Sequence, residues 1–121
     1  QWTHDLDNPA NRQFVEAFHK AYGRLPTLYA SQGYDAARLI GSALKSTGGD
    51  VSHTDALSEA ILKADFDSVR GKFKFSPNQH PVQDLYIRQV VKTADGNYTN
   101  ETLKAVFTDH GNVYVEQCKM K

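Results

Sequence analysis

Apolar positions recur every three to four residues through the first half of the chain, and this spacing predicts helices. Phe14 and Phe18 fall on one face of a helix over residues 9–22. Asn8 followed by Pro9 is typical of a helix start, because the Asn8 side chain can accept from free amides and proline has none to leave unpaired. Gly23 supplies the left-handed residue that commonly ends such a helix.

Two further helices are expected, over residues 28–45 and 54–64. The first mixes alanine and aliphatic residues with Gly33 and Gly41, a pattern too apolar for an exposed helix, so we expect it to be buried on most sides. Gly48-Gly49 predicts its end, because glycine adopts backbone angles that other residues resist.

After Phe66 the period changes from helical to two. Val69, Phe73 and Phe75 alternate with basic residues, which predicts a half-buried strand over residues 69–75. The sheet is expected to begin there.

The rest of the chain reads as strands separated by turns. Residues 76–81 form a turn-rich break, and residues 82–92 predict a long strand before the Asp95-Gly96 turn. Two short strands are expected near residues 102–107 and 113–117. Three helices followed by about four strands indicate a mixed α and β domain, the α/β class.

Charge balance narrows the set of partners. The chain has 14 Lys and Arg residues against 14 Asp and Glu residues, and no basic stripe is visible. Binding to nucleic acid or to an anionic membrane needs clustered positive charge, so we expect no nucleic acid partner.

Candidate catalytic and metal-binding residues are sparse. The five histidines are scattered, and no pair has the i, i+4 spacing that would let both rings hold one metal ion. Cys118 is the only cysteine, and its neighbours include no histidine that could act as its base. We therefore expect no catalytic residue, no metal, no cofactor and no enzymatic activity.

Three stretches together resemble one family. They are residues 5–11 (DLDNPAN), residues 29–37 (YASQGYDAA), and residues 69–75 (VRGKFKF) with 80–86 (HPVQDLY). In this order they resemble the C-terminal third of type I periplasmic binding proteins, the group of receptors that includes those for leucine, isoleucine and valine. The resemblance covers essentially the whole chain.

The resemblance implies a fold and a function. Family members have two α/β lobes, joined by three crossing segments, that close around a solute. Residues 1–80 would be the C-terminal part of the first lobe, and residues 81–121 a hinge crossing and the terminal strands of the second. The implied function is the periplasmic or extracellular solute-binding component of an ABC transporter, which captures an amino acid, amide or aromatic acid and docks on a permease. The alternative is a ligand-sensing module of a signalling receptor.

The resemblance also implies which residues contact the ligand. The family places an aromatic residue at the position of Tyr29, facing the cleft, and Ala30 and Gln32 are neighbours on the same turn. The alternative, that Tyr29 is a structural residue at a helix start, stays open. Because the chain would hold only part of a receptor, we also expect homo-oligomers, through uncovered apolar surfaces or exchange of the strand from Val82.

Overall fold

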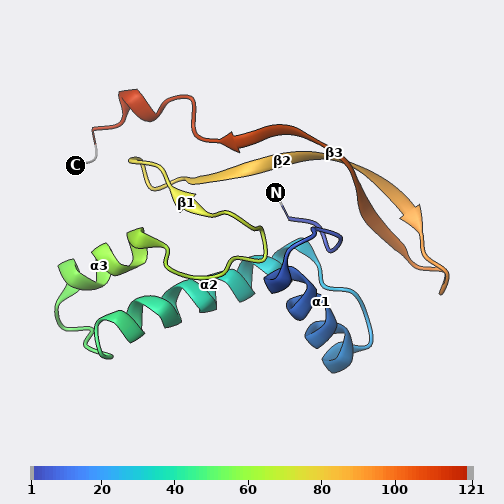
Figure 1. Ribbon diagram of the computed structural model, residues 1–121, viewed down its shortest axis with the longest axis horizontal. Helices are drawn as coiled ribbons and strands as arrows, with labels where there is room; N and C mark the ends of the chain where they lie inside the picture. The colour runs from blue at the N-terminus through green and yellow to red at the C-terminus, as the bar shows by residue number, and fades with distance from the viewer. Residues whose placement is uncertain (1, 120–121) are drawn as a thin grey trace.

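The computed structural model describes residues 2–119, and its three helices lie on one side of a three-stranded sheet (Figure 1). The elements are α1 (Pro9–Tyr22), α2 (Leu28–Ser46), α3 (Thr54–Lys63), β1 (Lys74–Phe75), β2 (Pro81–Lys92), β3 (Tyr98–His110) and a short 3-10 helix, η1 (Val115–Gln117). The three α-helices precede the strands, so the predicted α/β class is confirmed.

Capping explains where α1 begins and ends. The Asn8 side chain accepts a hydrogen bond from the backbone N–H of Asn11 at 2.8 Å, and Pro9 follows at the first helical position. Gly23 has a left-handed φ of 65° and donates its N–H to the carbonyl of His19 at 2.8 Å. Both ends predicted from the sequence are confirmed.

The second helix is less buried than its composition predicts. Its bounds agree with the prediction to within one residue, but Ser31, Asp35 and Ala43 are its only buried residues. Ile40 is exposed, and a Cβ added at Gly33 or Gly41 would meet nothing within 4 Å. The expectation of burial on most sides was therefore wrong, because no described element covers the outer face of α2.

The hydrophobic core joins the N-terminal segment to the helices. Trp2, Phe14 and Val69 form the buried cluster, and the rings of Trp2 and Phe14 meet edge to face with centroids 5.9 Å apart. Tyr34 of α2 packs on Phe14 with centroids 4.6 Å apart. The cluster therefore draws on four separate parts of the chain, and Leu6 borders it.

The predicted strand over residues 69–75 is mostly a loop. Only Lys74–Phe75 pairs in the sheet, although Val69 is buried and Lys72 and Lys74 are exposed, as the alternation predicts. The reason is a buried carboxylate: Asp35 accepts from the N–H of Val69 at 3.0 Å, and Gly71 then turns the chain with a φ of 87°.

The last two predicted strands also differ from the structure. Instead of a short strand near 102–107, β3 runs from Tyr98 to His110 and pairs with β2 in an antiparallel hairpin interrupted by register shifts. Residues 115–117 form η1, because the Asn112 side chain accepts from the N–H of Tyr114 at 2.8 Å and starts a turn.

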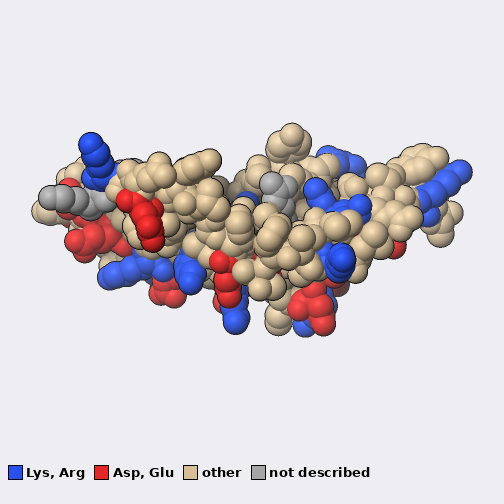
Figure 2. All heavy atoms as spheres, turned by 90° about the horizontal axis from the view of Figure 1, so that it is seen from above, with Lys and Arg blue, Asp and Glu red and all other residues tan. Residues whose placement is uncertain are grey.

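The hairpin leaves many apolar side chains uncovered. These exposed side chains are Ile87, Val90, Tyr98, Leu103, Val106 and Phe107. Figure 2, which views the molecule from the hairpin side, shows a broad uncharged surface with most charged side chains toward its lower border. An apolar surface of this kind favours contact with another protein surface.

Candidate functional site

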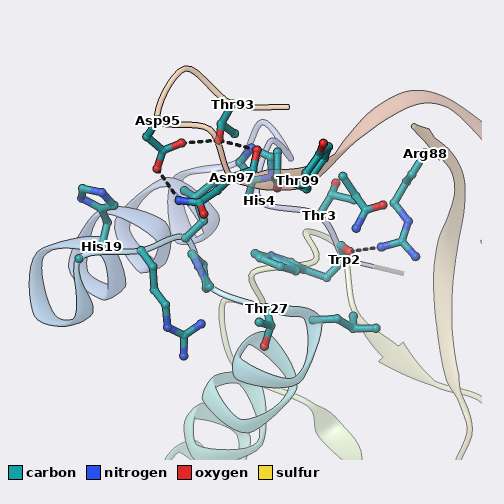
Figure 3. Close-up of a pocket in the computed structure, with 17 residues that line it drawn as sticks. Trp2, Thr3, His4, His19, Thr27, Arg88, Thr93, Asp95, Asn97 and Thr99 are labelled. Carbon is teal, nitrogen blue, oxygen red and sulfur yellow. Dashed lines mark hydrogen bonds between the residues drawn. The ribbon is translucent and has the colours of Figure 1, made fainter. Parts of the chain in front are cut away.

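A cavity of about 630 Å³ lies where three parts of the chain meet (Figure 3). Its walls are the N-terminal residues 2–4, the end of α1 with the connection to α2, and the tip of the β2–β3 hairpin. A volume of this size is in the range of small-molecule sites. The first residue of α2, Leu28, lies in its wall.

The cavity wall combines apolar rings with basic side chains. The apolar members are Trp2, Leu25, Pro26, Leu28 and Tyr98. The basic members are His4, His19, Arg24 and Arg88, and Asp95 is the only carboxylate among the wall residues. Such a wall suits a small organic anion with an apolar body, because the basic side chains favour negative charge and the rings favour apolar surface.

Asp95 is held within the hairpin turn. Its carboxylate accepts from the Thr93 hydroxyl and from the Asn97 amide, the latter at 2.8 Å. The hydrogen bond from Thr93, and then that from Asn97, lower the pKa of Asp95. The lowered pKa keeps Asp95 ionised, and its carboxylate holds the hairpin turn together through Thr93 and Asn97.

Each arginine has an additional contact with the protein. The guanidinium of Arg24 lies 5.4 Å from the ring centroid of Phe18, and Arg88 donates to the carbonyl of Trp2 at 3.4 Å. Figure 3 shows Arg88 reaching the backbone of Trp2 from the hairpin. These contacts restrict both side chains while leaving donor groups for a ligand.

The N-terminal segment is tied to the hairpin beside the cavity. The hydroxyls of Thr3 and Thr102 share a hydrogen bond of 2.7 Å. The Asp5 carboxylate accepts from the N–H of Thr102 at 2.8 Å and from its hydroxyl at 3.0 Å. This tie between Asp5 and Thr102 fixes one wall of the cavity against another.

The tie makes stability depend on pH. Partial burial raises the pKa of Asp5, but hydrogen bonds from Thr3 and Thr102 outweigh it and lower the pKa below the ordinary 3.8. Because the folded pKa is depressed, Asp5 stabilises the fold above about pH 4, and this contribution is lost as the pH falls through the folded value. In urea unfolding from pH 7 to pH 3, we expect Asp5→Asn to lose less stability on acidification than the unaltered protein. Equal losses in the two proteins would contradict this.

The three ligand residues suggested by the resemblance do not gather in one place. Tyr29 is 80% exposed on the first turn of α2, next to Leu28 but outside the cavity wall. Ala30 packs against the core cluster, and Gln32 is exposed. Tyr29 and Gln32, three residues apart, lie on neighbouring positions of the helix surface.

Sequence reasoning missed most of the cavity residues. Trp2 and Arg88 are 86 positions apart, and Arg24 lies in a connection without a motif. The one sequence feature that could have drawn attention to Trp2 is that it is the only tryptophan in the chain.

A family model described as periplasmic binding protein matches residues 1–97. The chain is 36% identical over 101 residues to Leu/Ile/Val-binding protein homolog 6 of Brucella abortus, an alignment that covers 81% of this chain and 26% of that protein. The chain thus spans about a quarter of the length of the curated relatives it matches.

Solved structures agree with this match. A solute-binding protein of an ABC transporter from R. palustris, in complex with benzoate, has a TM-score of 0.84 and 35% identity, and the match covers 98% of this chain and 31% of that one. An ABC transporter substrate-binding protein from Sphaerobacter thermophilus has a TM-score of 0.78 and 34% identity, over 90% and 30% of the two chains.

A third structure, from Rhodopseudomonas palustris BisB5 and in complex with 3,4-dihydroxy benzoic acid, has a TM-score of 0.63 and 29% identity, over 89% of this chain and 30% of that one. None of the helices within residues 2–119 has the length and apolar character needed to cross a membrane. The chain belongs to the periplasmic binding protein family, in its type I group.

Proposed function

We propose that this chain forms part of the solute-binding component of an ABC transporter in the periplasm. In this role it captures a small organic solute without changing it chemically and presents the solute to a membrane permease. The observation that carries the proposal is the match over 98% of the chain, at 35% identity, to a solute-binding protein of such a transporter.

The division into lobes follows the change from helices to hairpin. Residues 1–80 hold all three helices and belong to the first lobe in this proposal, and residues 81–121 hold the hairpin and belong to the second. The cavity lies between these two parts, as expected for a site that closes when two lobes approach each other.

An aromatic carboxylic acid is the solute class that we infer. Two of the similar solved structures hold benzoate and 3,4-dihydroxy benzoic acid. In this chain Arg24 and Arg88 offer bidentate donors for a carboxylate, and Trp2 and Tyr98 offer apolar ring surface. In this proposal the exposed ring of Tyr29, which follows the wall residue Leu28, covers the ring of the bound acid, and Ala30 and Gln32 are the weaker candidates for contact.

Truncating Tyr29 tests the assignment. We expect Tyr29→Ala to weaken benzoate binding by about 1–3 kcal/mol, the contribution of a ring packed on an apolar ligand. The measurement is a calorimetric titration of benzoate into the protein that carries this segment.

Tyr114 supplies the matched control for this titration. It is also an exposed tyrosine, but neither it nor its neighbours in sequence belong to the cavity wall, so Tyr114→Ala should leave benzoate affinity unchanged. Unchanged affinity in Tyr29→Ala would remove Tyr29 from the site. Binding of leucine with no response to benzoate would replace the aromatic acid by an aliphatic amino acid.

A further inference from the structure

One cross-strand pair of the β2–β3 hairpin binds the N-terminal segment. Arg88 and Thr102 lie opposite each other in the antiparallel register. Thr102 bonds to Thr3 and Asp5, and Arg88 donates to the carbonyl of Trp2 at 3.4 Å. Figure 1 shows the N-terminal segment between the hairpin and α1. The segment is therefore held by both strands of the hairpin at a single position along them.

The hydrogen bonds at Thr102 form a short chain with one direction. The Thr102 hydroxyl donates to the Asp5 carboxylate at 3.0 Å, and the Thr102 N–H donates to the same carboxylate at 2.8 Å. A hydroxyl has one proton, so the hydroxyl of Thr3, 2.7 Å away, is the donor to that of Thr102. Thr3 is 2% exposed, and this bond satisfies its buried hydroxyl. The chain ends on a charged acceptor, which makes its last bonds stronger than bonds between neutral groups.

The N-terminal segment is also bound to the helices. Asn11 of α1 donates to the carbonyl of His4 at 3.0 Å and accepts from the indole N–H of Trp2 at 2.6 Å. The contacts with α1 and those with the hairpin thus lie on adjacent residues of one segment. Thr102 itself lies outside the cavity wall, so it acts on the placement of the hairpin relative to the helices and not on a ligand directly.

The placement of the hairpin relative to the helices resembles that in a receptor with its solute bound. The match with a TM-score of 0.84 covers 98% of this chain, and therefore both the helices and the hairpin, and the matched structure is a complex with benzoate. A contact that is present in the bound arrangement, and lost when the lobes separate, favours the bound arrangement by its own free energy. Such a contact slows the release of a solute that it does not touch.

We propose that Thr102 is a positioning residue for solute retention, which acts through Thr3 and Asp5 to hold residues 1–80 and 81–121 in the arrangement that encloses the solute. The inference rests on the proposed function, because it takes these two parts as lobes that separate when the solute leaves. Loss of the Thr102 hydroxyl should speed release and leave capture nearly unchanged, because the contacts form only after the solute has entered.

Thr102→Val tests this role, because valine has the shape of threonine and lacks the hydroxyl. Stopped-flow mixing of benzoate with the receptor that carries this segment gives the association and dissociation rate constants. We expect Thr102→Val to raise the dissociation rate constant about tenfold, the effect of losing a hydroxyl that bonds to a carboxylate. Thr102→Ser keeps the hydroxyl, so its dissociation rate constant should stay within about twofold of that of the unaltered receptor.

Thr108→Val is the matched control. Thr108 is a threonine of the same strand, is exposed and lies outside the cavity wall, so its replacement should leave both rate constants unchanged. Circular dichroism checks that each variant folds. If Thr102→Val does not fold, Thr102→Ala replaces it, since alanine removes the same hydroxyl from a half-buried position.

Three results would overturn the proposal, and they separate it from the proposed function. Benzoate that binds and leaves Thr102→Val at the unaltered rate would refute the role of Thr102 alone. Slow release that Thr102→Ser does not restore, or a loss of stability with both rate constants unchanged, would show a structural role only. A receptor that binds neither benzoate nor leucine would refute the proposed function and the role of Thr102 with it.

Discussion

Replacing Asp35 by alanine should destabilise the chain by about 3–5 kcal/mol, because it leaves a buried positive charge without its partner. Asp35 is 4% exposed, and its carboxylate lies 3.5 Å from Nε of Arg70, whose side chain is 15% exposed. The same carboxylate accepts from the Ser68 hydroxyl at 2.6 Å and from the N–H of Val69 at 3.0 Å. A loss of this size is a large part of the total stability of an ordinary domain.

Urea unfolding followed by tryptophan fluorescence measures the loss, because Trp2 is the only tryptophan and lies in the core cluster. Asp67→Ala is the matched control: Asp67 is exposed one position before Ser68, and its removal should change stability by less than about 0.5 kcal/mol. Adding Arg70→Met to Asp35→Ala should recover part of the loss, since it removes the unpaired charge. If the double variant is no more stable than Asp35→Ala, the unpaired arginine is not the cause.

The helices could be predicted from the sequence because their signals are local. Asn8, Pro9 and Gly23 act within one turn of the helix ends that they define, and all three have their predicted roles in the structure. The two glycines after α2 likewise have left-handed φ values of 64° and 82°. A signal that acts over three or four residues is fully visible in a short window of sequence.

The strands were harder to predict because distant residues decide them. Alternation correctly predicted that Val69 would be buried and Lys72 exposed, but not that the chain would leave the sheet there. Asp35, 34 positions earlier, holds the amide of Val69 that a strand would have given to its neighbour. The carboxylate of Asp35, in α2, takes the hydrogen bond that a neighbouring strand would otherwise accept from Val69. The sequence around Val69 carries no sign of this, because Asp35 is distant along the chain.

The cavity was beyond sequence reasoning for the same reason. Resemblance pointed to Tyr29, which follows the wall residue Leu28 but is not itself part of the wall. The wall brings together Trp2, Arg24 and Arg88 from three separate segments. These residues become neighbours only because the N-terminal segment folds back over α1. One buried side chain, Asn11, hydrogen-bonds to two backbone carbonyls of this returning segment.

Asn11→Ala should cost at least about 3 kcal/mol of stability, although alanine is the better helix former at this position in α1. Asn11 is 0% exposed, and its side chain accepts from the indole N–H of Trp2 at 2.6 Å and donates to the carbonyls of His4 and Leu6 at 3.0 Å each. Truncation leaves these three groups without that partner, at a cost of about 1–3 kcal/mol for each buried group that stays unsatisfied.

Urea unfolding measures the loss, with Gln13→Ala on the exposed face of the same helix as control. Because helix propensity alone would make Asn11→Ala slightly stabilising, the sign of the change decides the matter. A stabilised or unchanged variant would show that the N-terminal segment, and with it Trp2 and His4 of the cavity wall, is held in place by other contacts.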